Sequence, residues 1–156
     1  MTVTLPKVRG ARPEDYPAVM RLCESLYQEN GLTRVAWKRV EEAVINGING
    51  QRAALGVIGQ CDDLGGMILL RFSECWYSDD LLLEELYNYV PPHHRNGHNA
   101  RALIEFAKAA SNRLEIPLLI GVLSTHRTRA KVRLYQRAFG EPAGAFFLYG
   151  GTTGGN

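Results

Sequence analysis

The chain has 156 residues, the length of one ordinary globular domain. Its 46% hydrophobic and 22% charged residues exclude a disordered or fibrous protein, and the formal net charge of +2 gives no general argument for nucleic-acid binding. Three scattered cysteines without a CxxC pair exclude a disulfide scaffold and are typical of reduced core residues. No apolar run approaches the roughly 18 residues of a membrane span, and the first residues lack the apolar region of a signal peptide. We therefore expect a single domain over residues 1–150 with a flexible tail over 151–156, in the cytoplasm.

The first third of the chain predicts one strand and two helices. Residues 3–11 predict a short strand, at a sheet edge because a proline interrupts it. Apolar side chains recur at helical spacing over residues 11–31 and again over 35–48. Gly47 and Gly50 are expected to fray the end of the second helix.

The middle of the chain changes to short apolar and aromatic runs. Residues 52–60, 65–77 and 81–90 are separated by turns rich in Asp and Ser, and this pattern predicts an antiparallel meander. Pro91 and Pro92 end the third run.

Helical spacing returns over residues 100–114 and 127–139. Between these helices, residues 117–124 form a continuous apolar run, which predicts a strand buried on both faces. Residues 142–150 predict a last strand. The order predicts an α/β (α+β) domain with a mixed, mostly antiparallel central sheet and helices on both faces.

The loop VPPHHRNGHNAR joins a predicted strand to a helix that begins near Asn99 or Ala100. The first turn of such a helix has unpaired N–H groups and the positive end of the helix dipole, so it favours a phosphate or pyrophosphate. Gly97 lets the backbone approach closely, and Arg95 and Arg101 add charge. The alternative is a polar turn with solvated arginines.

His93, His94 and His98 raise the alternative of a metal site. Adjacent histidines usually point apart, and no acid or cysteine lies at ligand spacing within the loop. Zinc takes three or four protein ligands. We therefore expect surface histidines and no metal.

The stretch VPPHHRNGHNARALIEFA resembles the signature region of the GNAT N-acetyltransferase superfamily, in particular of short, phage-type members. In that family a strand ending V-x-P leads into Arg/Gln-x-x-Gly-x-Gly/Ala and then a helix. The matching residues are Val90, Pro92, Arg95 and Ala100. One position departs: His98 stands where the family has its first glycine, and the available glycine is Gly97. The resemblance extends over nearly the whole chain, because the predicted elements follow the family's order.

The stretch TRAKVRLYQRAFG resembles the family's fourth helix. Leu134 and Tyr135 match its Leu-Tyr pair, Thr128 stands where asparagine is common, and Phe139-Gly140 inverts the usual pair. The resemblance implies that Tyr135 protonates the thiolate of coenzyme A. The alternative for Tyr135 is a core aromatic residue on an amphipathic helix.

The resemblance implies a GNAT-like acyl-CoA N-acyltransferase fold and transfer of an acetyl group from acetyl-CoA, the co-substrate, to a primary amine by direct attack. A backbone N–H near Val90 would stabilise the oxyanion. Pantetheine would lie between the strand ending at Val90 and the strand containing Leu123 and Ser124. The expected cofactor-binding residues are Tyr89, Val90, Arg95, Asn96, Gly97, His98, Asn99, Ala100, Arg101, Ser124, Thr128 and Lys131.

Glu84 and Glu85 are adjacent acids in an otherwise apolar strand. Alternation places one on each face, and a half-buried carboxylate is costly unless it is paired or used. We favour Glu85 as the catalytic base, with Glu84 as the second candidate. The alternative is that one or both form ion pairs with neighbouring basic residues.

A second function stays open, namely a catalytically silent acyl-CoA-binding module of the same fold. Nucleic-acid binding is disfavoured because we expect no interleaved, exposed aromatic residues on the basic fourth helix and because the net charge of +2 is small. The expected partners are a small-molecule or peptide amine and a second copy in a homodimer formed through Phe146, Phe147 and Tyr149, with no nucleic acid and no membrane. Candidate acceptor-lining residues are Tyr16, Tyr27, Trp37, Trp76, Tyr77 and Tyr87.

Overall fold

The computed structural model describes residues 2–150, so the predicted tail over 151–156 lies outside the described residues. The elements, in chain order, are β1 (Val8–Gly10), η1 (Pro13–Asp15), α1 (Tyr16–Asn30), α2 (Trp37–Asn49), β2 (Ala53–Gln60), β3 (Asp63–Glu74), β4 (Leu81–Tyr89), η2 (Pro92–His94), α3 (Asn99–Leu114), β5 (Leu118–Leu119) and α4 (Thr128–Phe139).

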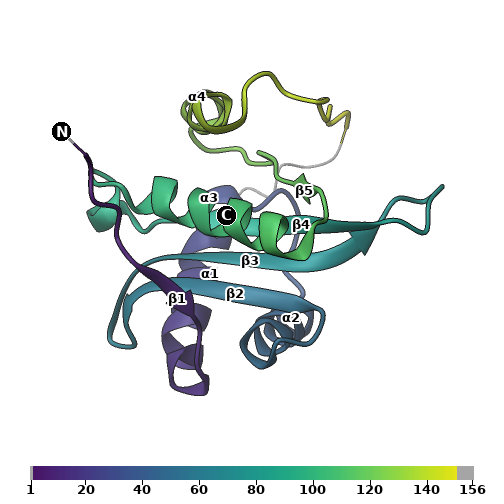
Figure 1. Ribbon diagram of the computed structural model, residues 1–156. Helices are drawn as coiled ribbons and strands as arrows, with labels where there is room; N and C mark the ends of the chain where they lie inside the picture. The colour runs from purple at the N-terminus through teal and green to yellow at the C-terminus, as the bar shows by residue number, and fades with distance from the viewer. Residues whose placement is uncertain (1, 151–156) are drawn as a thin grey trace.

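The five strands form one sheet in the order β1-β2-β3-β4-β5. Strands β1 to β4 pair antiparallel, and β5 pairs parallel with β4. Helix α3 covers one face, while α1 and α2 cover the other (Figure 1). The predicted meander and the predicted mixed, mostly antiparallel sheet with helices on both faces are confirmed.

Two apolar cores lie on the two faces of the sheet because successive strand residues point in opposite directions. On the α1 and α2 face, Val19 and Val44 pack with Leu69. On the α3 face, Ile68 and Leu70 pack with Leu103. The sheet is therefore buried on both sides, and the apolar runs of its central strands follow from that position.

The predicted fraying of α2 at Gly47 is wrong. Gly47 is buried inside the helix, and a Cβ there would lie 2.6 Å from Leu69 Cδ1 and 2.9 Å from Leu55 Cβ. The glycine therefore lets α2 lie close against the sheet. The helix ends at Gly50, whose φ of 67° is the left-handed conformation that glycine adopts without strain.

Strand β4 contains a bulge. Leu69 of β3 pairs with Tyr87, whereas the next residue, Leu70, pairs with Glu85, so Leu86 is an extra residue on β4. The bulge reverses the alternation of side chains along the strand. Leu83 therefore packs in the α3 core, whereas Tyr87 packs in the α1 and α2 core.

The predicted strand over residues 117–124, buried on both faces, is wrong in its length and its burial. Only Leu118–Leu119 is a strand, and Leu119 and Leu123 are 49% and 61% exposed. The outer edge of β5 has no strand beside it among residues 2–150. An apolar run at a sheet edge has the same sequence pattern as one at the centre, which explains the error.

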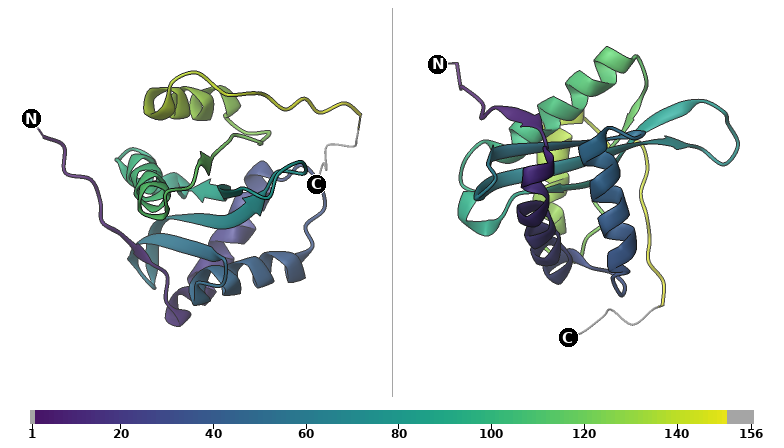
Figure 2. Two further views of the ribbon diagram at one scale, coloured as in Figure 1. Left: turned by 45° about the vertical axis from the view of Figure 1, so that its right-hand side comes forward. Right: turned by 90° about the horizontal axis from the view of Figure 1, so that it is seen from below.

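The predicted last strand over residues 142–150 is also wrong. This segment is an extended coil after α4 (Figure 2), and its Phe146 lines the cavity beside β4 and residues 119–124. Phe146 is 85% exposed and Phe147 is 95% exposed. A strand forms its backbone hydrogen bonds with a neighbouring strand, and within the described chain this segment pairs with no strand, not even with the open edge of β5.

The first strand is fixed to the start of α1 by one ion pair. Asp15 is the charged residue buried most deeply in the described chain, at 1% exposure. Arg9 Nη1 and Nη2 donate to its two carboxylate oxygens at 2.7 and 2.8 Å, and the Arg12 N–H donates at 2.7 Å. These hydrogen bonds lower the pKa of Asp15, with the Arg9 contact as the largest cause.

The three cysteines are free, but only Cys23 is a core residue as predicted, whereas Cys61 and Cys75 are half-buried. Cys23 of α1 is fully buried, with its Sγ 3.9 Å from the Tyr87 hydroxyl, and burial raises the pKa of its thiol to about 11. Among the helices formed by residues 2–150, none is long and apolar enough to cross a membrane.

Candidate active site

Strands β4 and β5 separate after a short contact. Their pairing joins only Leu83 with Leu118 and Glu84 with Leu119. Beyond these pairs a cavity of about 560 Å³ lies between β4, residues 119–124, the end of α1 and helix α4. The cavity exposes the second half of β4, including the bulge, to whatever binds there.

Glu85 and Tyr135 meet inside this cavity. The Tyr135 hydroxyl, on α4, donates a hydrogen bond to Glu85 Oε2 at 2.7 Å. Burial raises the pKa of Glu85 to about 7, although the hydrogen bond from Tyr135 acts in the opposite direction. Burial, together with the nearby carboxylate, raises the pKa of Tyr135 well above its ordinary value. The pair therefore combines a carboxyl group that exchanges its proton near neutral pH with a phenol that keeps its proton.

Glu84 has a different environment from its neighbour. Its Oε2 accepts hydrogen bonds at 2.9 Å from Arg71, the residue opposite it on β3. The ion pair is partly exposed to solvent. The two acids thus diverge as the strand alternation predicts, and Glu84 adopts the ion-paired alternative.

The Arg95 side chain points from its loop toward the end of β4 and the last turn of α1. Its Nε donates to the Val90 carbonyl oxygen at 2.8 Å, and its Nη2 lies 2.7 Å from both carboxylate oxygens of Glu29 on α1. Its guanidinium also lies 5.7 Å from the centroid of the Tyr89 ring, and Tyr89 and Val90 both line the cavity. Sequence reasoning missed Glu29, because an acid in the last turn of a helix carries no signal of a distant arginine.

The rest of the loop is open to solvent. Asn96, Gly97 and His98 are exposed, as is Arg101 in the first turn of α3. His98 is the N-cap residue of α3, and no side chain in the described part of the protein caps this helix start. A Cβ added at Gly97 would meet no described atom within 4 Å. The first N–H groups of α3 are therefore accessible, and this arrangement fits an anionic group such as a pyrophosphate.

Asn99 and Ala100, the first two residues of α3, are less exposed than the loop before them. Asn99 Nδ2 donates to the Gly65 carbonyl oxygen at 2.8 Å, so the Asn99 side chain holds α3 to the β2–β3 hairpin. Ala100 lines the cavity from the first turn of α3.

A polar cluster joins α4 to the end of α1. Lys131 Nζ contacts Asn30 Oδ1 and lies 2.9 Å from Ser124 Oγ. Thr128 Oγ1 donates to the Ser124 carbonyl oxygen at 2.8 Å, and His126 Nε2 lies 3.7 Å from Glu29. Burial lowers the pKa of Lys131. The predicted residues Ser124, Thr128 and Lys131 thus lie together, with Asn30 as a contact that the sequence did not suggest.

The candidate aromatic residues fall into two groups. Tyr27 and Tyr87 line the cavity. Trp76 and Tyr77 lie instead in the connection between β3 and β4, where they are 95% and 73% exposed. The remaining two, Tyr16 and Trp37, are also outside the cavity lining.

Known structures share this architecture, although no family model and no curated protein matches the sequence. The chain is similar to a ribosomal-protein-alanine N-acetyltransferase from Brucella melitensis biovar Abortus 2308, with 15% identity, a TM-score of 0.69, and coverage of 96% of this chain and 100% of that one. It is also similar to a GCN5-related N-acetyltransferase from Ralstonia eutropha JMP134, with 17% identity, a TM-score of 0.69, and coverage of 92% and 97%.

A third similar structure is AAC(6')-Iy in complex with the bisubstrate analog CoA-S-monomethyl-acetylneamine. Its identity is 13%, its TM-score is 0.70, and the match covers 96% of this chain and 99% of that one. At these identities the likeness establishes the fold.

The pKa of Glu85 predicts a specific dependence of stability on pH. The native value of about 7 lies above the ordinary 4.5, so the folded protein binds this proton more tightly than the unfolded chain does. The contribution of Glu85 is present below about pH 4.5 and is lost as the pH rises to about 7. The difference corresponds to roughly 3 kcal/mol.

Urea unfolding of the wild type and of Glu85→Gln at about pH 4.5 and pH 8 checks this prediction. The free energy of unfolding of the wild type, relative to the variant, should fall by at most roughly 3 kcal/mol over this interval. Because the variant retains every other titrating group, the comparison cancels their contributions to the pH dependence of stability. An equal difference at both pH values would contradict the assignment.

Proposed function

We propose that this chain, which has the fold of the GNAT N-acetyltransferases, transfers an acetyl group from acetyl-CoA to a primary amine. The observation that carries the proposal is the Tyr135–Glu85 hydrogen bond inside the cavity where β4 and β5 separate. The structural neighbours support it, since one of them is in complex with the bisubstrate analog CoA-S-monomethyl-acetylneamine.

The proposed proton route uses both members of the pair. An amine must lose a proton as it attacks the acetyl carbonyl, and Glu85 accepts that proton. Tyr135 donates its hydroxyl proton to the departing thiolate and recovers a proton from Glu85 through their 2.7 Å hydrogen bond. One proton thereby passes from amine to thiol, and the pair returns to its starting state. Positioned acid–base groups of this kind contribute roughly 10²–10⁴-fold to a rate.

The proposed coenzyme A site combines the cavity with the exposed start of α3. The N–H groups around Gly97 and the first turn of α3 would hold the pyrophosphate. Arg95 contributes less than the family pattern implies, because Glu29 already neutralises its charge. A backbone N–H near Val90 is the proposed oxyanion donor, and Lys131 adds positive charge at the cavity wall.

The acceptor is proposed to be a small-molecule or peptide amine. Turnover can be measured as thiol release from acetyl-CoA over a panel of aminoglycosides, polyamines and peptides with free N-termini. Calorimetric titration with coenzyme A measures binding separately from turnover. Binding without turnover on any amine would favour the alternative, a catalytically silent acyl-CoA-binding module.

Removing either member of the pair should reduce turnover strongly. Glu85→Gln and Tyr135→Phe should each lower kcat roughly 10²-fold or more while coenzyme A binding persists, because each removes a proton-transfer group and little volume. Glu84→Gln is the matched control, since it alters the adjacent carboxylate, which is paired with Arg71. Thiol-release kinetics check the prediction, and equal losses in Glu84→Gln and Glu85→Gln would contradict it.

Substitution of Gly97 tests the proposed coenzyme A site by binding alone, without a measurement of acetyl transfer. A Cβ there meets no described atom within 4 Å, so Gly97→Val should change the free energy of unfolding by less than about 0.5 kcal/mol. The same side chain would stand where the pyrophosphate approaches, so the Kd for coenzyme A should rise about tenfold or more. Gly10→Val, on β1 and equally free of contacts, is the control. Unchanged coenzyme A affinity in Gly97→Val would exclude this loop as the pyrophosphate-binding site.

We also propose a homodimer formed through residues 146–149 and the outer edge of β5. Phe147 and Tyr149 are fully exposed, and β5 has no partner on its outer side within residues 2–150. Such exposed apolar segments next to a free edge favour association.

Light scattering during size exclusion checks the proposed dimer. The wild type should have twice the mass of one chain, and Phe147→Asp should shift it to the monomer. Trp76→Asp is the control, because Trp76 is also 95% exposed but lies in the β3–β4 connection. A monomeric wild type would contradict the proposal.

A further inference from the structure

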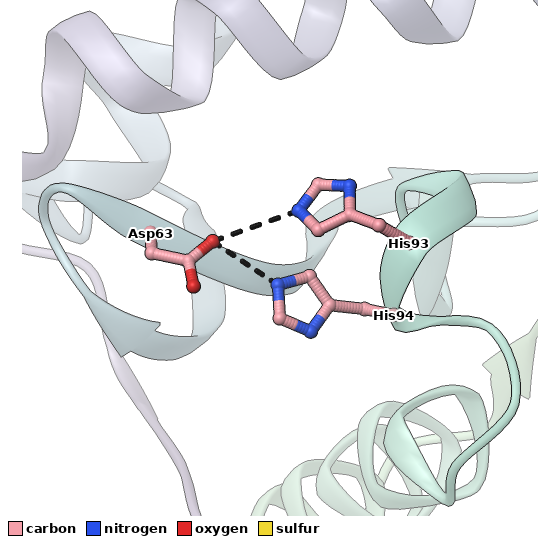
Figure 3. A group of neighbouring side chains, drawn as sticks. All are labelled: Asp63, His93 and His94. Carbon is pink, nitrogen blue, oxygen red and sulfur yellow. Dashed lines mark hydrogen bonds and ion pairs between the residues drawn. The ribbon is translucent and has the colours of Figure 1, made fainter.

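Two adjacent histidines of η2 turn toward one carboxylate from a distant hairpin (Figure 3). His94 Nε2 lies 3.1 Å from Asp63 Oδ1, and His93 Nε2 lies 3.7 Å from the same oxygen. Asp63 is the first residue of β3, directly after the turn from β2. The expectation that neighbouring histidines point apart is therefore wrong for this pair.

The spacing of these three atoms matches that of metal ligands. Bonds of about 2.0–2.1 Å to a tetrahedral zinc ion place neighbouring ligand atoms about 3.3–3.4 Å apart. The two Nε2–Oδ1 distances, 3.1 and 3.7 Å, lie on either side of this value. All three ligand atoms lie within 4.8 Å of one another, so they are grouped closely enough to be ligands of one ion.

The hydrogen bond between His94 and Asp63 explains the orientation of two of the three side chains. It does not explain His93, whose side chain is 68% exposed and yet turns to the same oxygen. The two imidazole rings lie 4.3 Å apart, tilted by 47°. His94, with its side chain 28% exposed, is the anchored member of the pair.

The donor set selects the kind of ion. Two imidazole nitrogens and one carboxylate oxygen suit borderline divalent transition metals, whereas Mg²⁺ and Ca²⁺ take oxygen ligands. Three protein ligands leave a coordination position for water.

We propose that Asp63, His93 and His94 form a site for a divalent transition-metal ion of the Zn²⁺ type, bridging the β2–β3 hairpin and η2. None of the three residues lines the cavity that holds Glu85 and Tyr135, so the metal site does not depend on the proposed acetyl transfer. A bound ion would tie the hairpin to the turn that leads into α3. This contact restrains the backbone just before the exposed loop over residues 96–98.

Calorimetric titration of the untagged, metal-stripped chain with ZnCl₂ tests the site, with CoCl₂ absorption as a second readout. We expect one ion per chain, visible absorption typical of Co²⁺ bound to nitrogen and oxygen ligands, and a higher midpoint of thermal unfolding with Zn²⁺. Asp63→Asn and His94→Gln should each weaken Zn²⁺ binding by about tenfold or more. His126→Gln removes a histidine from outside the cluster and should leave binding unchanged.

Two results would overturn the site. One is the absence of stoichiometric Zn²⁺ binding to the wild type. The other is equal Zn²⁺ affinity in the wild type, Asp63→Asn and His94→Gln, which would assign any binding to other groups. Circular dichroism of each variant verifies that a loss of binding does not come from unfolding.

Discussion

The one extra residue in β4 is the constraint on which the rest of this structure depends. If β4 ran without the bulge, alternation would place Tyr87 on the same face as Leu83 and Glu85. With it, Glu85 faces the gap beside α4, while Tyr87 enters the core under α1 and α2. A single strand thus supplies a titrating carboxyl group to a cavity and an aromatic ring to the interior within three residues. A regular strand cannot do both at that spacing.

The cavity that Glu85 faces exists because β4 and β5 separate after two residue pairs. If the pairing continued past Glu84 and Leu119, backbone hydrogen bonds would close the cavity. The opening is held by contacts from outside the sheet: Arg95 joins its loop to α1 through Glu29, and Lys131 joins α4 to Asn30. Polar side chains therefore replace a β-ladder along this edge. The apolar residues that a longer β5 would have buried remain exposed, as at Leu123.

Periodicity in the sequence was sufficient to predict the meander, α3 and α4, because each is specified by contacts repeated along its own length. It failed where the outcome depends on a distant neighbour. The run over residues 117–124 is apolar whether or not a strand lies beside it, and Glu29 has no local feature that indicates Arg95. Asp63 likewise lies 30 residues from His93. The divergence of Glu84 and Glu85 was predictable from alternation alone, whereas the Tyr135 contact required the packing of α4.

The complete burial of Cys23 has a consequence for the motions of the protein. A thiol at 0% exposure, with its pKa raised to about 11, cannot react with an alkylating reagent while α1 lies on the sheet. In a chain in which Cys61 and Cys75 are replaced by serine, the alkylation rate of Cys23 would therefore report how often α1 lifts away. Because α1 also carries Glu29 and Asn30, that rate would measure the opening of the cavity wall in solution.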